Sequence, residues 1–81
     1  MATYRCDVKQ QFGKFSALVW KATEKPGKPL AENMEDANGA ANAVFAALQG
    51  AGFAEGDEAI FRNTNYPSLR ELRTVIERAP Y

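Results

Sequence analysis

The chain has 81 residues, enough for one modest hydrophobic core but not for two, so we expect a single small α/β domain over residues 1–81. Hydrophobic residues make up 46% of the sequence and charged residues 25%, which is ordinary globular usage and argues against a mainly disordered chain. The formal net charge is zero, which argues against a protein that binds polyanions over its whole surface.

The charges are nevertheless segregated along the chain. Residues 1–30 carry six basic and two acidic side chains, residues 31–61 carry six acidic and no basic ones, and residues 62–81 carry four basic and two acidic ones. A partner can recognise such asymmetry. No apolar run is long enough to cross a bilayer, and no secretory signal follows Met1. The single cysteine excludes an intramolecular disulfide, and we therefore expect a cytoplasmic protein.

Two alternating stretches at the N-terminus predict a β-hairpin. Thr3–Gln10 and Lys14–Ala22 each place apolar side chains on one face. If Phe12-Gly13 forms a two-residue turn, the facing pairs are Val8–Ala17, Cys6–Val19 and Arg5–Trp20. Because Phe12 is a poor residue for the first turn position, a longer loop with a different register is the alternative.

A loop and an amphipathic helix follow the hairpin. Thr23–Ala31 contains two prolines and a glycine and is interpreted as a surface loop. We expect a helix over Asn33–Phe53, with Asn33 as N-cap and Gly52 in the left-handed position that ends it. Its apolar stripe consists of Ala37, Ala40, Ala41, Val44, Phe45, Leu48 and Ala51.

The last third of the chain predicts one strand and one helix. Asp57–Asn63 is interpreted as a third strand, and residues 62–67 as a polar connection. Ser68, with Glu71 three residues later, is typical of a capping box at the start of a helix that Pro80 ends. The predicted order is β-β-α-β-α. We expect an α+β fold with a mixed three-stranded sheet, the second and third strands parallel, and both helices packed on one face.

The residue types available for chemistry are few. There is no histidine, so the commonest general base and metal ligand are missing, and we predict no enzymatic activity, cofactor or metal site. Cys6 falls on the predicted core face and is expected to be an inert buried thiol. The acidic residues Glu55, Asp57 and Glu58 match no known cation-binding loop and are interpreted as a solvated turn.

The candidate binding surface is the sheet face opposite the helices. The predicted register places Arg5, Lys9, Leu18 and Trp20 there, with Ser16 among them. Ile60 and Arg62 join these residues if the third strand presents the same side, which gives six candidate binding residues. One hypothesis is a protein-interaction module that binds a partner or a second copy through these residues or an unpaired strand edge. The alternative is a binder of single-stranded nucleic acid, with bases stacked on Trp20 and phosphates held by Arg5, Lys9 and Arg62, assisted by Arg70 and Arg73.

Overall fold

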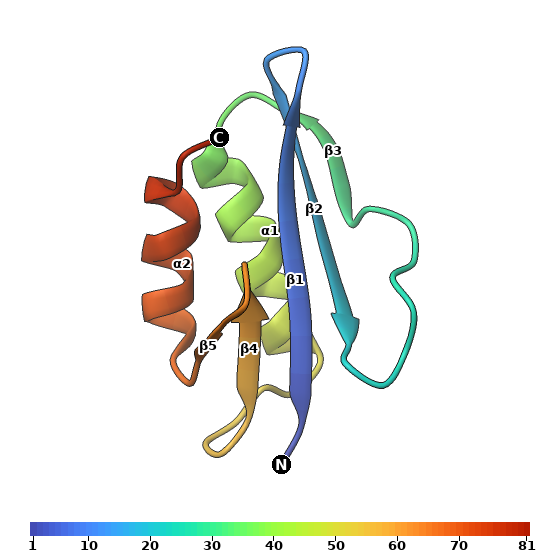
Figure 1. The fold of residues 1–81 in the computed structure, drawn as a ribbon, viewed down its shortest axis with the longest axis vertical. Coiled ribbons are helices and arrows are strands. Elements are labelled where there is room, and N and C mark those ends of the chain that lie inside the picture. Colours follow the sequence, from blue (N-terminus) through green and yellow to red (C-terminus); the bar gives the residue numbers. More distant parts are fainter.

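The computed structural model describes residues 1–81 as an α+β fold with five strands and two helices (Figure 1). The elements are β1 (Thr3–Gln11), β2 (Lys14–Lys21), β3 (Ala31–Met34), α1 (Ala37–Gly50), β4 (Glu58–Phe61), β5 (Thr64–Tyr66) and α2 (Leu69–Arg78). The strand order in the sheet is β3-β2-β1-β4-β5, with β1 parallel to β4 and all other neighbours antiparallel. The predicted fold class is therefore confirmed, but the prediction of three strands is wrong.

The two unpredicted strands also change the crossover. Because β3 reverses the chain before α1, the helix connects β3 to β4, and these two strands run in the same direction. The predicted parallel arrangement of the second and third strands, now β2 and β4, is wrong because β4 lies beside β1 and runs antiparallel to β2. A helix does join two parallel strands, as expected, but the first of them is β3, which the sequence pattern did not predict.

The N-terminal hairpin has the predicted register. Cys6 lies opposite Val19, Val8 opposite Ala17, and Arg5 opposite Trp20. The two-residue turn is made by Phe12 and Gly13, whose φ angles of 52° and 76° are both positive, as a type I′ turn requires. Phe12 adopts this unfavourable conformation with its side chain fully exposed.

Helix α1 ends as predicted but begins later. Its N-cap is Asp36, whose carboxylate accepts a hydrogen bond from the Gly39 N–H at 2.8 Å. Asn33, the predicted cap, instead lies within β3 at a φ of 58°. At the other end Gly52 has a φ of 86°, and the Phe53 N–H donates to the Leu48 carbonyl at 3.0 Å. This is the Schellman arrangement that the sequence predicted.

Helix α2 begins and ends close to its predicted bounds. Ser68 is its N-cap and accepts a hydrogen bond from the backbone N–H of Glu71 at 3.5 Å, and Arg73 pairs with Glu77 one turn later. The reciprocal bond of a full capping box is absent, because the Glu71 side chain does not reach back to Ser68. Leu72 and Ile76 of the predicted stripe are buried.

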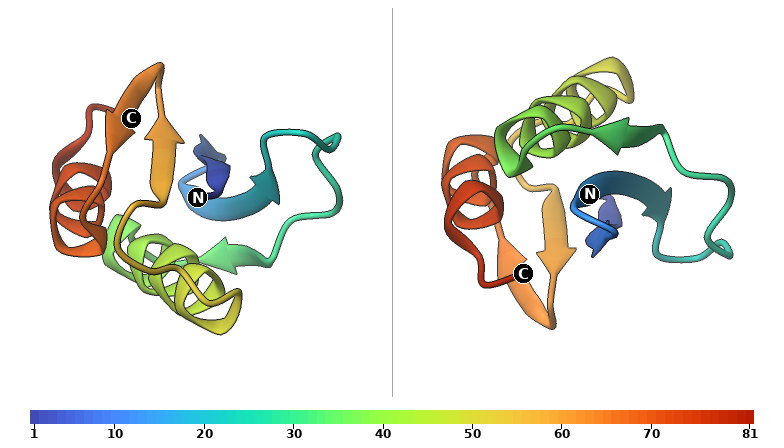
Figure 2. Two further views of the ribbon diagram at one scale, coloured as in Figure 1. Left: turned by 90° about the horizontal axis from the view of Figure 1, so that it is seen from below. Right: turned by 90° about the horizontal axis from the view of Figure 1, so that it is seen from above.

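The core lies between one sheet face and the two helices, as predicted. Figure 2 shows the sheet curving around α1, with β3 next to this helix at one edge and α2 next to the β4–β5 hairpin at the other. The thirteen buried apolar residues form one cluster: Tyr4, Cys6, Val8, Phe15, Ala17, Ala40, Ala41, Val44, Leu48, Ala59, Phe61, Leu72 and Ile76.

Asp57 is a structural residue and not part of a solvated turn. It is only 9% exposed, and its carboxylate accepts backbone N–H bonds from Ala2 at 2.7 Å and Ala54 at 3.0 Å. These hydrogen bonds hold the pKa of Asp57 below its ordinary value of 3.8. The interpretation of this residue as solvated is wrong, because its side chain anchors the start of β1 to the start of β4.

We expect Gly52→Ala to lower the free energy of unfolding by about 1 kcal/mol, because an L-residue is strained at a φ of 86°. No atom lies within 4 Å of the position that the new Cβ would take, so any loss reports the backbone conformation alone. Gly50→Ala is the matched control: it adds the same methyl group to the helical Gly50 and should raise stability by roughly 0.5 kcal/mol. Denaturant unfolding of both variants measures this, and equal effects would contradict the assigned helix end.

We expect Asp57→Asn to lower stability at pH 7 and to flatten the acid limb of the stability profile. A carboxyl whose folded pKa is depressed stabilises the fold above its unfolded pKa and loses that contribution as the pH falls through the folded value. Denaturant unfolding between pH 7 and pH 2 should therefore show a smaller acid-induced loss in the variant than in the wild type. If the variant and the wild type lose the same amount of stability between pH 7 and pH 2, the acid sensitivity comes from carboxyls other than Asp57.

Candidate functional site

The structure brings five of the six predicted binding residues together on the sheet face opposite the helices. Arg5 lies in the centre, with Trp20 beside it on β2 and Ile60 on its other side on β4. Leu18 and Lys9 belong to the next rows along the hairpin, opposite Asp7 and Ser16. We call these five residues, with the acidic Asp7 and Glu58 among them, the open face.

No element of the chain covers the open face, yet its apolar side chains are only partly exposed. Leu18, Trp20 and Ile60 are each half-buried, whereas Arg5 and Lys9 are exposed. The Lys9 ammonium lies 3.8 Å from the Asp7 carboxylate, and Arg5 has no ion-pair partner. The surface is thus an apolar row crossed by charges of both signs, a composition typical of protein interfaces.

Arg62 does not belong to the open face, which corrects its predicted placement. It lies with Asn63 in the turn between β4 and β5, where both residues have positive φ angles and strand alternation ends. Its guanidinium stacks on the Phe61 ring at 5.3 Å and on the Tyr81 ring at 4.9 Å, and it donates to the Pro80 carbonyl at 3.0 Å. Arg62 therefore holds the C-terminal residues against the helix side of the sheet.

Tyr81 completes this C-terminal contact, which the sequence pattern did not predict. Its ring meets Phe15 edge-on at 5.2 Å, and its hydroxyl donates to the Ile76 carbonyl at 2.7 Å. Burial raises the pKa of the Tyr81 hydroxyl, although the nearby Arg62 opposes the shift. The only feature of the sequence that could have indicated this contact is the presence of an aromatic residue directly after Pro80.

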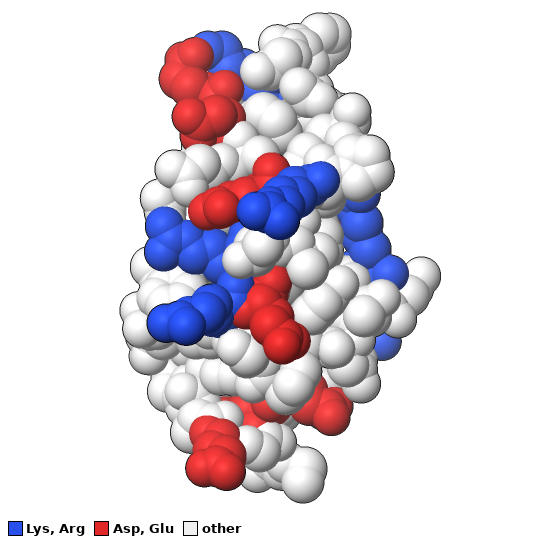
Figure 3. Space-filling model, turned by 90° about the vertical axis from the view of Figure 1, so that its left-hand side faces the viewer, with Lys and Arg blue, Asp and Glu red and all other residues white.

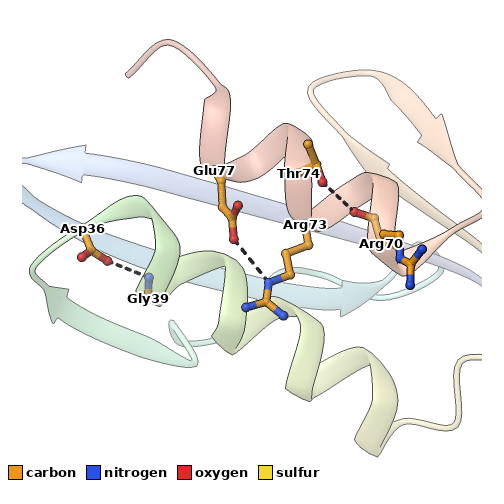
Figure 4. A network of polar contacts seen from close by, with 6 residues as sticks. All are labelled: Asp36, Gly39, Arg70, Arg73, Thr74 and Glu77. Carbon is orange, nitrogen blue, oxygen red and sulfur yellow. Dashed lines mark hydrogen bonds and ion pairs between the residues drawn. The ribbon is translucent and has the colours of Figure 1, made fainter.

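The arginines of α2 do not form a single basic patch. Arg73 pairs with Glu77 at 3.3 Å (Figure 4). Its guanidinium also stacks on the Phe45 ring of α1 at 5.6 Å. Figure 3, which looks onto the side that carries α2, shows acidic and basic side chains interspersed. Neither Arg70 nor Arg73 extends the open face, since α2 packs on the opposite side of the sheet. The electrostatic support for a phosphate-binding surface is correspondingly weak.

Cys6 is buried in the core, as predicted. Its Sγ donates to the Ile60 carbonyl at 3.4 Å, and burial, reinforced by the charge of Asp7, raises its pKa to about 12. Such a thiol is almost entirely protonated at neutral pH and is therefore a poor nucleophile.

The hollows of the surface hold no recognisable reactive set. The largest, of about 450 Å³, lies between the β4–β5 hairpin and α2 and includes Arg62, Arg78 and Tyr66 in its lining. No cluster of three or more histidine, cysteine, aspartate or glutamate residues is arranged to hold a metal ion.

No protein-family model, curated protein sequence or solved structure matches the chain. Neither helix has the length and apolar character needed to span a membrane.

We expect Cys6 to resist alkylation by iodoacetamide in the folded protein. A pKa near 12 in place of 9.0 lowers the thiolate fraction at neutral pH about a thousandfold, and burial also blocks access to the sulfur. Mass spectrometry should show complete modification in denaturant and very slow modification without it. Rapid modification of the folded protein would show that Cys6 is accessible and would contradict its placement in the core.

Proposed function

We propose that the protein is a small interaction module that associates with a second copy of itself through the open face. The observation that carries this proposal is the row Trp20–Arg5–Ile60, in which apolar side chains flank an arginine that has no ion-pair partner. Two sheets that pack face to face bury such rows against each other about 10 Å apart.

The charges of the open face favour a second copy over other occupants. Arg5 and Lys9 are balanced by Asp7 and Glu58, so the face is neutral overall and can be complementary to itself. The whole chain also has a formal net charge of zero, so two copies do not repel each other strongly. A nucleic acid would meet Asp7 between the two cations, which reduces its attraction to this face.

The test is the concentration dependence of mass by sedimentation velocity. We expect the wild type to dimerise and Leu18→Lys to weaken the dimer by about tenfold or more, because the new ammonium loses its water in the interface. Phe12→Lys is the matched control: it makes the same apolar-to-lysine change at the exposed hairpin turn, away from the open face, and should leave the dimer unchanged.

Two results would overturn this proposal. A wild type that stays monomeric at every accessible concentration would exclude self-association, and a dimer lost in Phe12→Lys but kept in Leu18→Lys would place the interface at the turn. Single-stranded DNA or RNA that quenches Trp20 emission at low salt only, with a monomeric protein, would favour the nucleic-acid hypothesis instead.

A further inference from the structure

A second surface, which adjoins the open face and shares Trp20 with it, lies along the outer edge of β2. Strand β3 pairs with β2 only at Phe15 and Ala17, with an irregularity between them. From Leu18 to Lys21 no strand lies outside β2, because the loop over residues 22–30 swings away from this half of the strand (Figure 1). The chain returns at Leu30, whose N–H donates to the Ala17 carbonyl at 2.7 Å.

The backbone of this stretch presents unpaired hydrogen-bonding groups. The Ala22 N–H donates to the Thr3 carbonyl of β1, so the even-numbered residues of β2 bond towards β1. Alternate residues of a strand bond to opposite sides, and the N–H and C=O of Val19 and the N–H of Lys21 therefore point outwards. Only the Lys21 carbonyl is used, by the N–H of Glu24 at 2.9 Å. An added strand in line with β3 would satisfy the remaining groups.

An apolar hollow of about 260 Å³ lies directly beside this edge, between β2 and the C-terminal half of α1. A cavity of about 150 Å³ accommodates a benzene ring, so this one has room for a large apolar side chain. Leu30, at its rim, keeps 49% of its surface exposed. Six of the seven lining residues are apolar: Tyr4, Val19, Trp20, Leu30, Ala47 and Ala51, with Lys21 as the seventh.

The charge around the hollow is positive. Lys21 is its only charged lining residue, and the loop that starts there carries Lys25 and Lys28 against a single acidic residue, Glu24. A lysine beside the edge repels basic segments and attracts acidic ones. The edge of β2 should therefore bind an acidic strand in preference to a basic one.

From these observations we infer that the groove between β2 and α1 binds an extended, acidic peptide segment of another protein. The segment adds as a strand along Val19–Lys21 and inserts one large apolar side chain between Val19 and Ala51. Backbone bonds to the strand edge supply affinity and the hollow supplies selectivity, the general logic of strand addition. The unpaired backbone groups are what distinguish this occupant from a small apolar molecule, which would leave them unsatisfied.

The first experiment is selection from a displayed library of random octapeptides, followed by synthesis of the strongest binder. We expect enriched sequences to combine an apolar residue with flanking aspartate or glutamate. On titration of the synthetic peptide into ¹⁵N-labelled protein, the amide signals of Val19, Lys21 and Ala51 should shift. Absence of enrichment, or shifts confined to other residues, would overturn the inference.

Two substitutions on α1 and its cap make a matched pair. Ala51→Arg should fill the hollow and weaken peptide binding by about tenfold or more. Ala46→Arg places the same side chain at an exposed alanine outside the hollow and should change the affinity by less than about twofold. Equal effects of the two variants would exclude the hollow as the binding site. Neither residue lies on the open face, so failure here leaves the proposed dimer intact.

A backbone-modified peptide tests strand addition itself. Methylating the peptide nitrogens that would face β2 removes their donors and should weaken binding about tenfold or more, whereas methylating the alternate nitrogens should have little effect. Lys21→Glu should likewise weaken binding of the acidic peptide. If the Val19, Lys21 and Ala51 signals instead shift with protein concentration alone in the Leu18→Lys variant, whose open-face dimer is weakened, the occupant is a second copy of the chain and the inference is wrong.

Discussion

The close seating of α1 in the curved sheet is the constraint on which the rest of the structure depends. Ala40 and Ala41 of the helix and Ala17 of β2, the strand that packs most extensively on this helix, have no exposed surface, so small side chains lie on both sides of this contact. Small residues let the two backbones approach. Figure 2 shows the sheet curving around this helix. One sheet face is thereby buried and the other left open. The same curvature brings the free half of β2 towards the end of α1, so both candidate surfaces follow from it.

The features that the sequence predicted correctly are those encoded over short distances. Alternation and a two-residue turn determined the hairpin register, even though Phe12 is a poor turn residue. A glycine followed by an apolar residue determined where α1 ends, and a serine determined where α2 begins. Most of the candidate site was predicted for the same reason: once the register was right, Arg5, Leu18 and Trp20 had to share a face, with Lys9 and Ile60 beside them.

The features that were missed depend on contacts between distant parts of the chain. The segment Ala31–Met34 is polar and lacks alternation, and it becomes a strand only because the edge of β2 offers it partners. The local sequence around Asp57 predicts an acidic turn. Its structural role depends on the Ala2 amide, which lies 55 residues away in the chain. Strand alternation predicts that Arg62 lies on the open face. In the structure it lies in the β4–β5 turn and stacks on the Tyr81 ring, on the helix side of the sheet. The sequence pattern likewise contained no sign of the groove beside β2, since strand β3 itself was not foreseen.

The place of β1 in the middle of the sheet has a consequence for how the chain folds. Its pairing with β2 crosses a two-residue turn, so the hairpin can form early and fast, whereas its pairing with β4 must close a loop of more than fifty residues. During synthesis the hairpin emerges first, with one edge and its concave apolar face unoccupied until α1 and β4 follow. Strand β1 therefore gains its first partner, β2, early and its second partner, β4, much later. Until β4 arrives, the free edge of β1 is the part of the nascent chain most exposed to pairing with a wrong strand.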